Sequence, residues 1–230
     1  MAGVEDEIRH QLALACRILG VAGQGDNVLG HLSARIPGTD RFLMKRAAAG
    51  LEEITDEDLV LLDLDGNVLA GGPVHREVPI HSRILRARPD VACVVHTHTV
   101  HAVAFAARGL ELKRVSQDGS FFAPGVEVFD EFTNLVLTDE EGDIVARHLG
   151  DRQALLLLAH GMIVTGADIP AATVSALMLD RACQIQLLAQ PTPESEVREA
   201  PLDEALSVQA IRRDHQGSAF DYLVRRLPKL

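Results

Sequence analysis

One apolar run that ends in two histidines constrains this chain more than any other stretch. Val91 to Val95 favours a buried strand, and the chain continues through His96-Thr97-His98. Side chains two residues apart project from the same face of an extended chain, so the imidazoles of His96 and His98 should point together. Such a pair can bind one divalent cation, but a working site needs further ligands, and the same spacing also occurs by chance without a metal.

Two more residues are candidates to complete a metal site. His160 follows the apolar run from Ala154 to Ala159 and precedes Gly161, so a second predicted strand ends in a polar residue. A buried histidine there needs a metal or a hydrogen-bond partner, because an unpaired buried polar group costs about 1 to 3 kcal/mol. Glu77 lies where a loop enters the helix predicted around Pro79. Glu77 and His160 are therefore the candidate additional ligands.

Composition and charge limit the possible partners. The 230 residues are 47% hydrophobic and 24% charged, which is ordinary for one globular domain, and we expect one domain over residues 1–230 with 191–230 as a helical tail. The net charge of −11 is spread along the chain and argues against nucleic acid, although a small anionic substrate remains possible. No apolar run approaches the ~20 residues of a membrane helix, and the N-terminus lacks signal-peptide features. Cys16, Cys93 and Cys183 show no paired spacing. We predict a cytoplasmic protein that does not bind membranes.

Periodicity and turn residues predict mixed helices and strands. The expected helices cover residues 5–20, 79–88, 139–149 and 168–190, with another through Val103 and Phe105 that ends near Gly109. The expected strands cover 31–36, 42–45, 59–64, 91–98, 126–129 and 154–160, with 163–164 pairing beside the last. The rest of 110–131 should be irregular, 191–193 should be a link, and the tail should hold two weakly amphipathic segments.

Several motifs together resemble the class II aldolase/adducin family: Glu77, Arg88-Pro89-Asp90-Val91, Val95-His96-Thr97-His98 and His160-Gly161. The resemblance covers most of residues 5–190. It implies an α/β fold with three α/β/α layers around a central, largely antiparallel sheet, and a homotetramer with sites near subunit interfaces. It also implies that the three histidines bind one divalent metal per subunit, and that Glu77 ligates this metal or acts as an acid or base. The adducins of this family keep the fold without the metal, so a non-enzymatic assembly module is an alternative.

The chain departs from the sugar-phosphate aldolases of this family at the places where they cradle phosphate. Small hydroxyl and amide donors are replaced here by larger basic groups, which suit a carboxylate, and the planar fork of arginine can make two parallel hydrogen bonds to one. The residues expected to bind an anionic substrate are His31, Lys45, His75 and Arg76, with Arg46 as an alternative to Lys45. Each could instead be a structural histidine or a solvated surface charge.

The stretch from Gly30 to Arg35, followed by Arg41-Phe42-Leu43, is similar to a family branch that includes decarboxylases of hydroxylated aromatic dicarboxylates. With the altered phosphate pocket, this similarity favours a metal-dependent decarboxylase acting on a compound such as a dihydroxyphthalate or a hydroxypyridine dicarboxylate. The metal would act as a Lewis acid on the phenolic oxygen, with Glu77 as the candidate proton donor. Manganese or zinc is favoured, and cobalt or iron(II) also suits such ligands. An aldolase acting on an unphosphorylated, carboxylate-bearing substrate is the alternative.

Other residues have open roles at this point. A substrate ring could stack only on a phenylalanine, with Phe42, Phe105, Phe121 and Phe122 as candidates, because the chain has no tryptophan and one tyrosine. That tyrosine, Tyr222, could reach the site of a neighbouring subunit.

Overall fold

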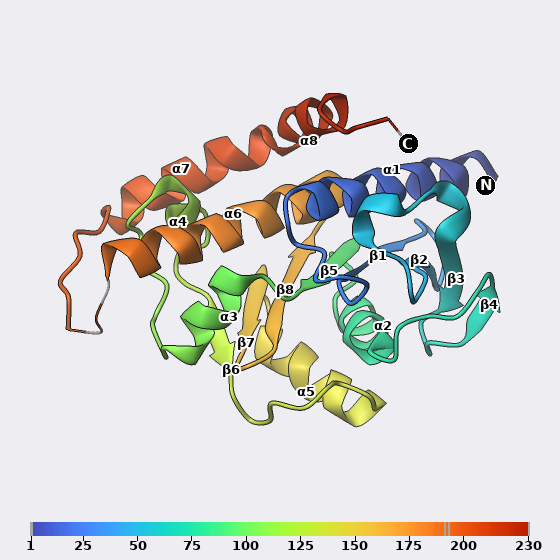
Figure 1. The fold of residues 1–230 in the computed structure, drawn as a ribbon, viewed down its shortest axis with the longest axis horizontal. Helices are drawn as coiled ribbons and strands as arrows, with labels where there is room; N and C mark the ends of the chain where they lie inside the picture. The colour runs from blue at the N-terminus through green and yellow to red at the C-terminus, as the bar shows by residue number, and fades with distance from the viewer. Residues whose placement is uncertain (1, 191, 193, 230) are drawn as a thin grey trace.

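A single eight-stranded sheet lies at the centre of the computed structural model, which describes residues 2–190, 192 and 194–229 (Figure 1). Its strand order is β4-β3-β2-β1-β5-β8-β7-β6. Neighbouring strands are antiparallel except for β6 and β7, which are parallel. The strands are β1 (His31–Arg35), β2 (Arg41–Lys45), β3 (Leu59–Asp63), β4 (Val68–Ala70), β5 (Cys93–Thr97), β6 (Glu127–Phe129), β7 (Ala154–Leu157) and β8 (Gly161–Gly166).

Helices cover both faces of the sheet and so form the three predicted α/β/α layers. One buried core joins the sheet to α1, α3, α4 and α6, and a second joins it to α2 and α5. In Figure 1, α7 and α8 lie outside α6 and α1. The helices are α1 (Ala2–Val21), α2 (Val78–Ala87), α3 (Val100–Ala107), α4 (Gln117–Phe121), α5 (Asp139–Leu149), α6 (Ile169–Ala189), α7 (Leu202–Asp214) and α8 (Gln216–Arg225), and the 3-10 turns are η1 (Leu51–Glu53) and η2 (Asp56–Asp58).

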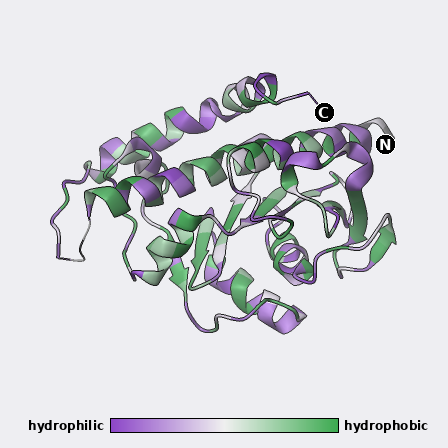
Figure 2. Cartoon of the chain, in the orientation of Figure 1, coloured by the Kyte–Doolittle hydropathy of each residue, from purple (hydrophilic) through white to green (hydrophobic). Residues whose placement is uncertain are grey.

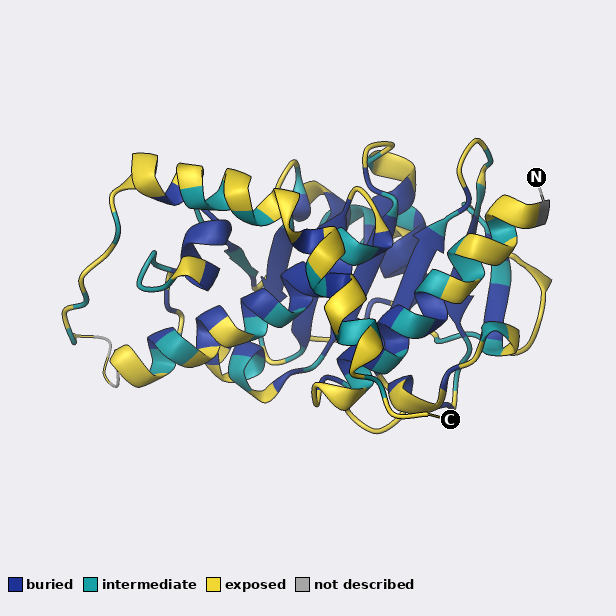
Figure 3. Cartoon of the chain, turned by 90° about the horizontal axis from the view of Figure 1, so that it is seen from above, coloured by how far each residue is buried: buried dark blue, intermediate teal, exposed yellow. Residues whose placement is uncertain are grey.

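Alternation along the central strands decides which side chains meet which helix layer. In β5, Cys93 and Val95 enter the core beneath α1 and α6, whereas Val94 enters the core against α2 and α5. Figure 3 shows these strands buried between helices whose outer turns are exposed. Because His96 is two residues after Val94 and pairs in register with His31 of β1, both histidines face α2.

The predicted helix starts are confirmed where a capping residue marks them. Thr138 accepts a hydrogen bond from the N–H of Glu141, whose carboxylate accepts one from the N–H of Thr138, as a capping box requires. Asp168 likewise accepts from the N–H of Ala171 at the start of α6. Apolar side chains of α6, such as Val174 and Leu179, enter the core against the sheet, and Figure 2 shows both hydrophobic and hydrophilic residues along this helix. No helix among the described residues combines the length and the apolar character needed to cross a membrane.

Three details differ from the sequence expectation. The short edge strand β4 follows the turn at residues 65–67, and α4 interrupts the region expected to be irregular, with Ser116 capping the N–H of Gly119. The predicted strand to His160 is too long, because β7 ends at Leu157 and His160 lies in the turn before β8. In the expected link, Pro191 and Pro193 lie outside the described residues.

Candidate metal centre

Four predicted side chains converge at one end of β5. Glu77 precedes the first residue of α2, His96 lies in β5, His98 follows that strand, and His160 lies in the turn between β7 and β8. One ligand atom from each of these residues lies within 4.8 Å of the other three. The central position of β5, between β1 and β8, explains how segments so far apart in sequence meet there.

One backbone carbonyl and one side-chain carboxylate fix which nitrogen of His96 and of His98 carries the proton. Nδ1 of His96 lies 3.0 Å from the carbonyl oxygen of Met162, and Nδ1 of His98 lies 3.1 Å from Oδ2 of Asp26. Both partners can only accept, so each Nδ1 carries the proton and each Nε2 presents a lone pair. The two Nε2 atoms are 3.0 Å apart, an arrangement that a shared cation would stabilise.

His160 and Glu77 add two more candidate ligand groups. Nε2 of His160 is buried and makes no hydrogen bond among the described residues, and Oε1 of Glu77 lies 3.4 Å away. Oε2 of Glu77 lies 3.8 Å from Nε2 of His96, while Oε1 also accepts from the N–H of Val136 at 3.0 Å. Three imidazole nitrogens and one carboxylate oxygen are a donor set that suits zinc, manganese, cobalt or iron(II).

Burial and polar contacts together keep His96, His98 and Glu77 in the ionisation states that metal binding requires. Burial, and then the neighbouring imidazole of His31, lowers the pKa of His96 well below its usual value, and burial followed by His160 lowers the pKa of His98. Burial alone would raise the pKa of Glu77, but the polar contact with His160, the electrostatic interaction with the ring of His96 and the N–H of Val136 outweigh it and lower that pKa to about 2. His96 and His98 are therefore neutral imidazoles, and Glu77 is an ionised carboxylate, at neutral pH.

The turn that carries His160 packs directly against the end of β5. A Cβ atom at Gly161 would lie 2.5 Å from the carbonyl oxygen of Thr97 and 2.7 Å from Cδ2 of His98. Only glycine fits this approach without displacing the His-x-His segment. The preceding Ala159 has a φ of 55°, a left-handed conformation that is uncommon for alanine.

Three of the four predicted substrate-binding residues lie beside this cluster. The ring centroid of His31 is 4.9 Å from that of His96 and 4.6 Å from that of His75. The fully buried Lys45 donates to the carbonyl oxygen of Val28 at 3.0 Å, and its Nζ lies 3.1 Å from Nε2 of His75. The side chain of Arg76 is exposed and makes no hydrogen bond or ion pair with any described residue.

Burial changes how these basic groups can act. Burial and the charge of Lys45 lower the pKa of His75 to about 4, and burial lowers the pKa of His31 well below its usual value. Both imidazoles are therefore neutral at pH 7. Burial also lowers the pKa of Lys45, to about 8, which leaves the ammonium as the main positive charge among these three groups.

The structure adds two residues that the sequence interpretation missed, His81 and Ser33. Both are fully buried, and Nδ1 of His81 lies 2.7 Å from Oγ of Ser33. Nε2 of His81 lies 2.7 Å from Nδ1 of His31. The available signal was the spacing of four residues from Glu77 to His81, which places both on one side of a helix.

Other candidate residues lie outside the cluster. The four candidate phenylalanines for ring stacking are all buried: Phe42, Phe105, Phe121 and Phe122. Arg46 pairs with Asp58, and Tyr222 is half-exposed on α8, where its hydroxyl contacts Arg226. The exposed apolar side chains adjacent in sequence to site residues are aliphatic: Val28, Leu29, Val100, Leu135 and Leu137.

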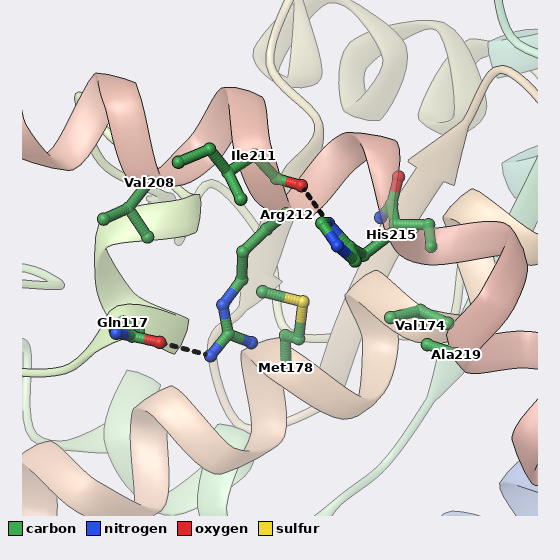
Figure 4. A pocket seen from close by; sticks show the side chains of 9 residues that line it. Gln117, Val174, Met178, Val208, Ile211, Arg212, His215 and Ala219 are labelled. Carbon is green, nitrogen blue, oxygen red and sulfur yellow. Dashed lines mark hydrogen bonds between the residues drawn. The ribbon is translucent and has the colours of Figure 1, made fainter.

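A separate cavity of about 420 Å³ lies between α4, α6, α7 and α8 (Figure 4). Its apolar wall includes Val174, Met178 and Ile211. The guanidinium of Arg212 extends across the cavity and donates a hydrogen bond to Oε1 of Gln117 at 2.9 Å. Residues of the metal cluster do not line this cavity.

Comparisons with known proteins identify the family of this chain. Residues 10–187 match the sequence model of the Class II Aldolase and Adducin N-terminal domain. The decarboxylase NovR of Streptomyces niveus is 34% identical over 194 residues, which are 83% of this chain and 72% of that protein. A 3,4-dihydroxyphthalate decarboxylase of Arthrobacter keyseri is 31% identical over 215 residues, covering 84% of this chain and 86% of that protein. The crystal structure of an aldolase II superfamily protein from Pseudomonas syringae aligns with a TM-score of 0.88 and 28% identity, over 99% of this chain and 94% of that one.

Proposed function

The chain belongs to the class II aldolase and adducin family, and from that premise we propose that it is a metal-dependent lyase that decarboxylates a hydroxylated aromatic carboxylate or dicarboxylate. The observation that carries the proposal is the convergence of Glu77, His96, His98 and His160 beside the buried amine of Lys45. Metal ligands and an anion-binding group in one place suit a small substrate that has both a coordinating oxygen and a carboxylate.

The similar proteins support an enzyme of the lyase class, and two of them bear the names of decarboxylases. A dihydroxyphthalate or a hydroxypyridine dicarboxylate has the required chemistry. We further propose His96, His98 and His160 as metal ligands, and manganese or zinc as the metal, with cobalt or iron(II) as other options. A bound dication would supply a Lewis acid that stabilises the negative charge developing on a substrate oxygen as the carbon–carbon bond breaks.

The low pKa of Glu77 favours its role as a ligand in the resting site. A carboxylate with a pKa of about 2 holds no proton at pH 7, so it cannot serve as a stored acid. To act as the donor to the ring carbon, Glu77 would have to take a proton from solvent. Decarboxylation consumes one proton for each carbon dioxide released, and this route supplies it.

Lys45 is the proposed partner of a substrate carboxylate. Its ammonium carries the charge, while His75, which contacts Nζ of Lys45, and His31 contribute hydrogen bonds as neutral imidazoles. Arg76 adjoins Glu77 in sequence and is exposed, so we propose that it binds a second carboxylate at the mouth of the site. A substrate ring would meet aliphatic groups, such as those of Leu135 and Leu137, in place of a phenylalanine.

The proposed reaction is tested by carbon dioxide release from a panel of hydroxylated aromatic dicarboxylates with manganese- or zinc-loaded protein. A chelator-treated sample is the control, and aldehyde detection runs in parallel on hydroxy-keto acids. Metal-dependent carbon dioxide release is the expected result. Aldehyde without carbon dioxide would instead support the alternative, an aldolase acting on an unphosphorylated carboxylate-bearing substrate. A purified chain that binds no stoichiometric metal would favour a non-enzymatic, adducin-like assembly role.

We also propose a cytoplasmic homotetramer. The exposed aliphatic side chains near the site support association, because Val100 is 78% exposed and Leu135 47%. Tyr222, exposed on α8 in one subunit, is then the proposed contribution to a neighbouring site. Light scattering at several protein concentrations measures the oligomeric state directly.

A further inference from the structure

Both ring nitrogens of His148, in the last turn of α5, contact a carboxylate. Nδ1 lies 2.9 Å from Oε1 of Glu127, and Nε2 lies 2.8 Å from Oε1 of Glu131. A carboxylate only accepts hydrogen bonds, and a neutral imidazole has a single N–H. Both contacts are therefore hydrogen bonds only when both nitrogens carry a proton. The geometry indicates an imidazolium that bridges β6 to the chain that follows it.

The charged groups around this ring favour its protonated form. Glu127 and Glu131 line a surface hollow together with Arg147 of α5 and Arg152. Arg152 pairs with Oε2 of Glu127 at 3.0 Å, which leaves Oε1 of the same carboxylate to His148. The hydrogen bonds to Glu127 and then to Glu131 outweigh burial and raise the pKa of His148 above its usual value.

The segment that joins β6 to α5, residues 130–138, depends on side chains for its position (Figure 1). Up to Leu137, its residues make no backbone-to-backbone hydrogen bond with any described residue. Glu131 anchors the start of the segment through His148. Near its end, Leu137 donates its N–H to Oε2 of Glu141 at 2.8 Å. Loss of the contact with His148 would therefore loosen one end of the β6–α5 segment.

The β6–α5 segment also makes a contact with the candidate metal centre. The N–H of Val136 donates to Oε1 of Glu77 at 3.0 Å. The side chain of Val136 is 1% exposed and lies in the core against α2 and α5. This hydrogen bond fixes one carboxylate oxygen, while Oε2 lies 3.8 Å from Nε2 of His96. A displacement of Val136 would break the bond and leave the carboxylate of Glu77 free to turn.

We propose that the doubly protonated ring of His148 is a positioning group for Glu77, acting through the β6–α5 segment. Only the role of Glu77 as a metal ligand rests on the proposed function. When the ring loses one proton, Nδ1–H still donates to Glu127, which its strand and Arg152 hold in place. The lone pair on Nε2 then repels Glu131, whose side chain is 53% exposed and can turn into solvent.

The proton on His148 gives the pH dependence its sign. Because the pKa of His148 is raised, the bridge is complete below the usual value of 6.5 and is lost as the pH rises through the higher value of the folded protein. Metal affinity normally increases with pH, since ligands lose their protons, and release of the segment opposes this increase. The contribution of His148 is therefore measured by comparing variants at the same pH.

Hydrogen exchange of residues 130–138 in the metal-free chain, including the Val136 amide bound to Glu77, reports whether the segment is held. H148R keeps a positive charge and several donors at every pH, whereas H148Q is always neutral. At pH 9, exchange in this segment should be about 2- to 5-fold faster in H148Q and in the unmodified protein than in H148R. At pH 6, only H148Q should exchange faster. H10Q is the matched control, because His10 also contacts a carboxylate, that of Asp56, but on α1.

Zinc affinity, measured by competition with a chelator, tests the effect on the metal centre. At pH 7 the dissociation constant of H148Q should exceed that of H148R by about 2- to 5-fold, and H10Q should match the unmodified protein. E131A changes an exposed side chain and leaves His148 in place, so it tests the same bridge from its other end. It should reproduce the faster exchange and the weaker zinc binding of H148Q.

The outcomes separate this inference from the proposed function. Equal exchange in H148Q and H148R at the same pH, or the same acceleration in H10Q, would overturn the bridge. Faster exchange with unchanged zinc affinity would overturn the positioning of Glu77. A chain that binds no zinc or releases no carbon dioxide would count against the proposed function alone, because exchange at Val136 in the metal-free chain still decides whether His148 holds the contact with Glu77.

Discussion

Replacing Gly161 with alanine should disturb the metal centre without touching any ligand. The new Cβ would lie 2.5 Å from the carbonyl oxygen of Thr97 and 2.7 Å from Cδ2 of His98. Ordinary contacts between such atoms are near 3.5 Å, so one segment must move by roughly 1 Å. Metal–ligand distances tolerate deviations of only about 0.2 Å, so the movement is several times larger than the site can absorb.

The expected cost appears in two quantities. Overpacking should lower the free energy of unfolding of the metal-free protein by about 1 to 3 kcal/mol. Displacement of His98 should weaken metal binding by about 10- to 100-fold, which corresponds to roughly 1.4 to 2.7 kcal/mol. Urea unfolding of chelator-treated protein measures the first quantity, and competition with a chromogenic chelator measures the second.

Gly217 provides the control for this substitution. It lies in α8, and a Cβ atom there would meet no atom within 4 Å. G217A should therefore leave metal affinity unchanged and stabilise the helix by about 0.5 to 1 kcal/mol. A folded G161A protein with the metal affinity of the unmodified chain would refute the reasoning, because the turn would then have moved without transmitting the shift to His98.

Three further predictions concern individual side chains. Metal content measured by elemental analysis should fall in each of the variants H96A, H98A and H160A. H101A, which removes only a contact with Asp180, is the control and should keep its metal. Unchanged metal content in all three ligand variants would rule out the proposed ligands. The pKa of Lys45 is about 8 in the folded protein, below its usual 10.5. Between pH 8 and pH 10.5 the unfolded chain therefore binds more protons than the folded protein, so the free energy of unfolding should rise with pH over this range. This rise, at most about 3 kcal/mol, should be absent in the variant K45M. Urea unfolding of K45M and of the unmodified protein from pH 8 to 10.5 measures it, and parallel stability curves would contradict the prediction. R76A should raise KM for dicarboxylates much more than for monocarboxylates, and equal increases would remove the proposed role of Arg76.

Local sequence patterns predicted much of the fold because their causes are local. Apolar runs in the sequence predicted the central strands. The capping residues Thr138 and Asp168 predicted helix starts that the structure confirms. The convergence of His96, His98 and His160 required knowledge of which strands are neighbours. The motif resemblance supplied this information, and the pairing of β5 with β8 explains it.

The remaining features depend on contacts between distant segments. His81 lies on the apolar face of α2, and its polar partners on β1 are visible only once helix and strand are packed together. The start of α4 depends on Ser116, and Gly119 within it is a poor helix former, so helical propensity gave little signal. The extent of β7 was overestimated because Leu158 and Ala159 are apolar, although they form the turn to His160.

β5 lies between β1 and β8, and the chain delivers the segments of the candidate site in a fixed order during synthesis. His31, Glu77, His96 and His98 leave the ribosome before the turn that carries His160, and β8 follows that turn. A nascent chain therefore has only part of the proposed ligand set until its last central strand has docked. Metal capture at full affinity by the proposed ligands would then be a late step in maturation.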